Sequence, residues 1–312
     1  MAFKPQSQAW PGHDAVLLVH GIGEDPTAPR SEANEALRSA LGDRADSFAI
    51  YELRYDGIND WFAEKTQLAG LVPQLLGFLK GKFGGDHLGD TVAAFAGDVI
   101  WPVLSLSARA ALREAFIVQL NKMIQDGPHA ATQRISIVCH SMGCFHTYEA
   151  IHAACGDMSN LIGPQAGVRL QNVIFMASPV QLIKSAVKEL GVVIPKRTTL
   201  ALSRSLSKPV ADLNGVEEPY VLGKFVSITG ALDPVGGHLF RQKLDWAYMA
   251  VPGQDSLIDD QHETNITSRE ELIATLSASL QTRERPNITL QNPHDWVAYI
   301  DRHQTDLRTW LT

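Results

Sequence analysis

Residues 135 to 143 read I-S-I-V-C-H-S-M-G, and this stretch indicates both the fold and the chemistry of the chain. Ile135 to Cys139 is a largely apolar, mostly β-branched run, which is typical of a buried strand. Ser141 follows among small residues, and a helix-like segment begins directly after it. A strand, a sharp turn and a helix hold a serine hydroxyl above the end of a sheet. That position suits a nucleophile because backbone N–H groups there bind the oxyanion that forms when it attacks.

The stretch resembles the nucleophile elbow G-x-S-x-G of the α/β-hydrolase superfamily, in particular its esterase-like and lipase-like serine hydrolases. Gly143 stands where the family has its second glycine, whereas Cys139 replaces the first. Small residues are favoured at both places because the strand and helix backbones nearly touch. The resemblance extends from about Ala15 to Leu311. It implies an α/β-hydrolase fold, with a mostly parallel central sheet, helices on both faces and helical insertions.

Strand and helix patterns alternate along the chain, which independently predicts an α/β protein with a parallel sheet. Ligands bind such sheets at the carboxyl ends of the strands. We expect a single domain over residues 1–312, with a helical cap insertion at 57–105 and a second insertion at 180–222. The expected strands are 15–19, 47–55, 135–139, 173–177, 225–229 and 288–290, and the expected helices are 31–41, 107–125, 142–154 and 295–311.

Composition limits the class of protein. The 312 residues are 45% hydrophobic and 20% charged, as in an ordinary globular protein. A net charge of -7 argues against nucleic acid as a partner. We expect a cytoplasmic protein without a transmembrane segment, because neither a signal-peptide stretch nor a run of about 18 apolar residues occurs. Three cysteines, expected as reduced thiols, and the lack of clustered ligands predict no metal site. The oligomeric state stays open.

A catalytic triad can be assembled in the chain order of the family, which is Ser, then Asp or Glu, then His. Asp233 follows the expected strand 225–229 in the loop L-D-P-V, and His294 follows 288–290 in N-P-H-D-W. A neutral imidazole is suited to take the proton of Ser141 near pH 7. The carboxylate of Asp233 would hold the tautomer of His294 and stabilise its imidazolium form.

The oxyanion hole needs two backbone N–H groups. One is expected from Met142, at the helix N-terminus, and the other from Ile22 in the loop H-G-I-G at 20–23. Gly21 and Gly23 would let this loop approach the substrate closely. His20 and His140 are expected to orient the substrate-binding loops.

Other residues compete for the acid and base roles. His238 lies five residues past Asp233, His262 has no expected strand before it, and His303 falls inside the expected terminal helix. Neither Asp245 nor Asp259 follows an expected strand. Placement at a strand end therefore favours Asp233 and His294.

These residues together predict a carboxylic-ester hydrolase that works through an acyl-enzyme on a small-molecule ester, without a metal or organic cofactor. Acyltransferases, thioesterases and amidases would use the same triad, and a non-catalytic binding module of the same fold is a further alternative. Aromatic and leucine side chains at 61–104 either form an apolar acyl or lipid-like pocket or pack as core. The complete triad argues against the non-catalytic alternative.

Overall fold

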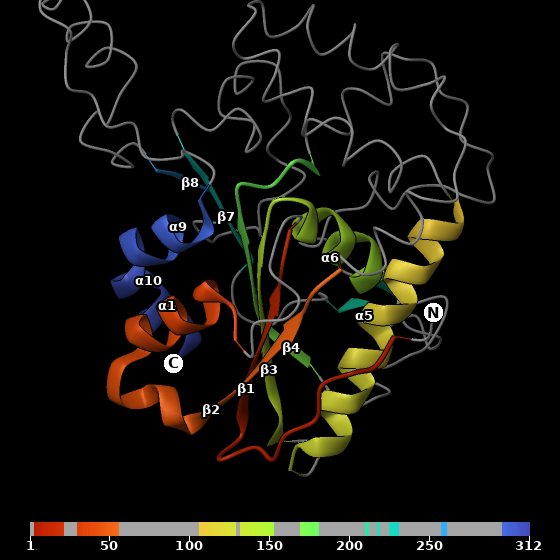
Figure 1. Ribbon diagram of the computed structural model, residues 1–312, viewed down its shortest axis with the longest axis horizontal. Helices are drawn as coiled ribbons and strands as arrows, with labels where there is room; N and C mark the ends of the chain where they lie inside the picture. The colour runs from red at the N-terminus through yellow and green to blue at the C-terminus, as the bar shows by residue number, and fades with distance from the viewer. Residues whose placement is uncertain are drawn as a thin grey trace, which may run out of the picture.

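A parallel sheet forms the centre of the protein, seen here in a computed structural model that describes residues 3–21, 30–55, 106–128, 132–152, 169–180, 210–211, 217–218, 225–230, 257–260 and 295–312. Within these ranges six strands pair in the order β2-β1-β3-β4-β7-β8, and every pair is parallel (Figure 1). They are β1 (Asp14–Val19), β2 (Phe48–Leu53), β3 (Arg134–His140), β4 (Arg169–Met176), β7 (Phe225–Gly230) and β8 (Leu257–Asp260).

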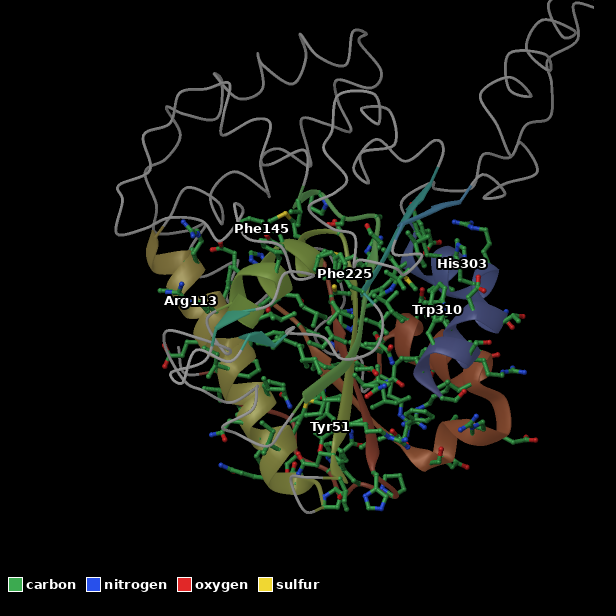
Figure 2. All side chains as sticks on the ribbon, turned by 180° about the vertical axis from the view of Figure 1, so that it is seen from behind. Tyr51, Arg113, Phe145, Phe225, His303 and Trp310 are labelled. Carbon is green, nitrogen blue, oxygen red and sulfur yellow. The ribbon has the colours of Figure 1, made fainter. Side chains whose placement is uncertain are left out.

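Helices cover both faces of this sheet. On one face lie α1 (Glu32–Leu41), α9 (Trp296–Arg302) and α10 (Gln304–Leu311), and on the other α5 (Leu106–Asp126) and α6 (Met142–His152) (Figure 1). Figure 2 shows the same division from behind, with Arg113 and Phe145 on the α5 and α6 side and His303 and Trp310 opposite. The predicted α/β class, with helices on both faces of a parallel sheet, is confirmed.

The continuous apolar run of β1 reflects burial on both faces. Leu17 and Val19 pack in the core beneath α5 and α6, whereas Val16 and Leu18 pack beneath α1, α9 and α10. All four side chains are fully buried. Successive side chains of a strand point to opposite faces, so a strand covered by helices on both sides needs apolar residues at every position.

Capping interactions stabilise both ends of α1. Ser31 caps the start, where its hydroxyl accepts a hydrogen bond from the Asn34 N–H at 3.1 Å. Gly42 ends the helix at a φ of 58°, and its N–H donates to the carbonyls of Arg38 and Ser39. A short 3-10 helix, η1 (Gly42–Ser47), then leads directly into β2.

The terminal helix is divided, contrary to the single helix expected over 295–311. It breaks at His303, where α9 ends and α10 begins, and the His303 Nδ1 lies 3.2 Å from the Asp306 Oδ2 in the first turn of α10. The 57–105 insertion and the expected strand 288–290 lie outside the described residues. Of the 180–222 insertion, the structure describes Val180 and a small antiparallel pair, β5 (Val210–Ala211) with β6 (Glu217–Glu218).

Glutamine side chains of the N-terminal segment pair with the outer edge of β2. The Glu52 N–H donates to the Gln6 Oε1 at 2.8 Å, and the Gln8 Nε2 donates to the Ile50 carbonyl at 2.6 Å. The backbone N–H of Gln6 also donates to the Gln119 Oε1 on α5 at 2.8 Å. Among the residues described, β2 is an edge strand of the sheet, and these side-chain amides occupy backbone groups that could otherwise pair with another chain.

Candidate active site

Ser141 lies between β3 and α6 in a backbone conformation that serine rarely adopts. Its φ angle is 52°, in the left-handed region that residues with a Cβ generally avoid. Its N–H donates to the Met176 carbonyl on β4 at 3.0 Å, and its own carbonyl accepts the Cys144 N–H at 3.0 Å. The sharp strand-to-helix turn is therefore held by hydrogen bonds on both sides. Strained residues held in this way cluster at functional sites.

The start of α6 approaches the end of β1 so closely that only glycine fits at position 143. A Cβ built on Gly143 would lie 2.4 Å from the Val19 carbonyl oxygen and 2.5 Å from that of His20. Both distances are far inside van der Waals contact, and both obstacles are backbone atoms. Glycine at this position therefore permits the helix N-terminus to lie beside the serine.

Cys139, in place of the first family glycine, fits because its side chain lies in the core beneath α5 and α6. Its thiol is 3.5 Å from the Ile174 carbonyl oxygen, and the Cys144 thiol is 3.5 Å from that of Met176. Burial raises the pKa of the Cys139 thiol well above its usual value, and the neighbouring Cys144 raises it further. A protonated, fully buried thiol is inert, so Cys139 does not compete with Ser141 as a nucleophile.

Gly21 brings the loop after β1 against the serine. A Cβ at Gly21 would lie 2.9 Å from the Ser141 Cβ and 3.4 Å from its Oγ. Met142 is the first residue of α6, and N–H groups in a first helical turn have no partner within the helix. Ile22 and Gly23, expected to complete the oxyanion hole, lie outside the described residues. The structure thus places a helix start and the beginning of the expected oxyanion loop beside the Ser141 hydroxyl.

The ring of Trp296, the first residue of α9, contacts two histidines. Its centroid is 4.7 Å from that of His20 in an edge-to-face arrangement and 5.5 Å from that of His140 in a nearly parallel stack. All three side chains are buried. His20 precedes Gly21 and His140 precedes Ser141, so Trp296 connects the terminal helix to both backbone segments at the serine.

A buried carboxylate, that of Glu52 near the end of β2, faces His20. The Glu52 Oε2 lies 3.6 Å from the His20 Nε2. The carboxylate accepts hydrogen bonds from the Asn34 Nδ2 at 2.5 Å, the Arg54 Nε at 2.8 Å and the Ser31 N–H at 3.2 Å. Burial alone would raise the pKa of Glu52, but the bonds from Arg54, Asn34 and Ser31 and the charge of His20 outweigh it and lower that pKa. Glu52 is therefore ionised at neutral pH.

Sequence reasoning did not single out Glu52 or Trp296. A signal for Glu52 is present in the strand F-A-I-Y-E-L, where one carboxylate interrupts a run that is otherwise buried. A charge in such a strand requires partners, because burying it alone is strongly unfavourable. Trp296 follows His294 by two positions, but the sequence does not indicate which side chains its ring contacts.

Asp233 and His294 both lie outside the described residues, as do their rivals His238 and Asp245. The described chain passes close to each in sequence. Gly230, the last residue of β7, precedes Asp233 by three positions, and Asp295, the N-cap of α9, directly follows His294 in the sequence.

Two competing residues lie nearer to a strand than expected. Asp259 belongs to β8, and His262 follows the last residue of that strand, Asp260, by two positions. The expectation that no strand precedes His262 was therefore wrong, whereas Asp259 lies within a strand and does not follow one. The segment L-I-D-D has only two apolar residues and ends in two carboxylates, so its pattern does not indicate a strand, whereas pairing with β7 makes it one.

Within the described ranges, no group of three or more His, Cys, Asp or Glu side chains is arranged to hold a metal ion. Among the helices described there, none has the length and apolar character needed to cross a membrane.

The chain was compared with protein-family models, curated proteins and solved structures. No protein-family model and no curated protein matches the chain. A crystal structure described as a "putative hydrolase" from Agrobacterium vitis S4 is similar over 89% of this chain and 91% of its own, with 11% sequence identity and a TM-score of 0.37. At that TM-score the similarity carries no argument about function, which has to come from the site itself.

Proposed function

We propose that the chain is a serine hydrolase of the α/β-hydrolase type that cleaves carboxylic esters through an acyl-enzyme. Ser141 is the nucleophile, His294 the general base and Asp233 the acid that orients it. The observation that carries the proposal is the left-handed φ of 52° at Ser141, between a buried parallel strand and a helix N-terminus. Such a strained serine at the carboxyl edge of a sheet matches a nucleophile elbow.

The proposed reaction proceeds in two steps. His294 takes the proton of the Ser141 hydroxyl as its oxygen attacks the acyl carbonyl, and the alcohol leaves with a proton returned by the imidazole. His294 then activates a water molecule that releases the acid. In each step the N–H groups of Met142 and Ile22 stabilise the oxyanion.

The position of Trp296 supports His294 as the base. Its ring stacks on His140, the residue before Ser141. His294 is two positions before Trp296, and two residues span at most about 7 Å. This short spacing in the sequence supports His294 as the base that we propose for Ser141.

Hydrolysis of p-nitrophenyl esters of increasing acyl length tests the nucleophile. We expect the wild type to be active and Ser141→Ala to lose at least about a thousandfold in kcat/KM, as expected when a nucleophile is removed. A fluorophosphonate probe should label only the wild type. A preference for long acyl chains would support an apolar pocket built by 57–105. An inert, unlabelled wild type would instead favour a binding module.

A second experiment separates the competing bases and acids. His294→Gln is compared with His262→Gln, and Asp233→Asn with Asp259→Asn, each scored by kcat/KM and by the rate of fluorophosphonate labelling. We expect the His294 and Asp233 variants to lose both quantities. The variants at the end of β8 and just after it should retain them. The opposite pattern would assign the catalytic pair to the end of β8.

A further inference from the structure

We propose that Glu52 is a positioning residue, which acts through His20 to hold Gly21, at the start of the expected oxyanion loop, against Ser141. This inference rests on the proposed function, because it assigns a supporting group to the same site. Glu52 does not contact the nucleophile. Its carboxylate instead lies 3.6 Å from the His20 imidazole. His20 directly precedes Gly21, where a Cβ would lie 2.9 Å from the Ser141 Cβ.

His20 is held from several sides at the end of β1. Its N–H donates to the Leu53 carbonyl on β2 at 3.0 Å, its carbonyl oxygen would lie 2.5 Å from a Cβ on Gly143, and its ring meets Trp296 edge-on. The side chain is completely buried. The Glu52 Oε2 lies 3.6 Å from the His20 Nε2, so neighbouring residues of one strand, β2, lie against both the backbone and the ring of His20.

A shift of His20 is transmitted to the nucleophile within one residue. A Cβ on Gly21 would already be 2.9 Å from the Ser141 Cβ, so Gly21 lies directly against the serine. Ile22, whose N–H is proposed to bind the oxyanion, follows immediately. Displacing a preorganised donor by about 1 Å is enough to reduce a rate by about a hundredfold.

Glu52 could also act only as a stabilising residue. Its carboxylate accepts hydrogen bonds from Ser31, the N-cap of α1, from Asn34 in α1 and from Arg54. A purely structural role would make Glu52→Gln less stable and leave turnover per folded molecule unchanged. A positioning role predicts in addition a lower kcat with little change in KM, because only an interaction in the transition state is weakened.

The test measures kcat, KM and melting temperature for Glu52→Gln, His20→Gln and the double variant. Glu149→Gln is the matched control: Glu149 is also buried and bound by an arginine, with the Arg109 Nε at 3.0 Å. We expect Glu52→Gln to lose about ten- to a hundredfold in kcat. The double variant should be within about threefold of His20→Gln alone, because coupled residues are not additive. Glu149→Gln should lose stability and keep kcat.

Several outcomes would overturn the positioning role. One is an unchanged kcat in Glu52→Gln, and another is a double variant in which the two losses multiply. If Glu52→Gln does not fold, it is replaced by Glu52→Asp, which keeps the charge on a shorter side chain. An unchanged kcat in Glu52→Asp, together with a lowered melting temperature, also contradicts the proposal. These results leave a wild type that is active and labelled at Ser141, whereas failure of the proposed function removes that activity itself.

Discussion

Gly143→Ala tests whether the close contact between β1 and α6 is needed for the elbow. The added Cβ would lie 2.4 Å from the Val19 oxygen and 2.5 Å from the His20 oxygen, so α6 must retreat by about 1 Å to restore ordinary contact at 3.4 Å. Overpacking of this kind costs about 1–3 kcal/mol, and rigid backbone obstacles favour the upper end. Replacing a helical glycine returns about 0.5–1 kcal/mol. We therefore expect a net loss of about 2 kcal/mol of unfolding free energy.

Urea unfolding followed by circular dichroism measures the stability, and the rate of fluorophosphonate labelling measures the geometry at Ser141. A displacement of about 1 Å at the proposed oxyanion donors predicts labelling about a hundredfold slower. Gly12→Ala is the control, because its Cβ would be 3.2 Å from the Ser47 oxygen and needs only a small adjustment. If Gly143→Ala were within 0.5 kcal/mol of the wild type on the scale of surface substitutions, and were labelled at the wild-type rate, the steric reasoning would be refuted.

Three further outcomes follow from the described contacts. Gly21→Ala should slow fluorophosphonate labelling at least about tenfold, because the new Cβ would be 2.9 Å from the Ser141 Cβ; an unchanged rate would show that the loop yields freely. Burial, with a smaller contribution from Arg109, lowers the pKa of His146 from 6.5 to about 3. As the pH falls, the unfolded state therefore takes up a proton before the folded state does. The free energy of unfolding decreases as pH falls from about 6.5 towards 3. Unfolding free energies of His146→Asn against pH should lack this contribution of about 1.4 kcal/mol per pH unit, and parallel curves for both proteins would contradict it. Gln6→Ala should lose about 1–2 kcal/mol in urea unfolding, because the Glu52 N–H loses the acceptor at 2.8 Å; equal midpoints would show that this bond does not stabilise the edge of β2.

Local sequence patterns predicted the elements around the serine well. The apolar runs at β1 and β3, the Ser31 cap and the Gly42 stop were all recognisable because each depends on residues adjacent in the chain. The division of the terminal helix at His303 was not predicted, since its helical pattern continues through the break. The strand β8 was missed for the opposite reason: its own residues favour a loop, and pairing with β7 overrides them.

The sequence by itself determined the α/β class and the position of the serine elbow, because strand and helix periodicity and small residues beside Ser141 are local properties. Only the tertiary structure decided which distant residues surround that elbow. Glu52 faces His20 because β2 pairs with β1 in register, and Trp296 reaches His20 and His140 because α9 packs across the sheet. Such contacts join segments tens to hundreds of residues apart, and they arise from burial of apolar faces that no local pattern specifies.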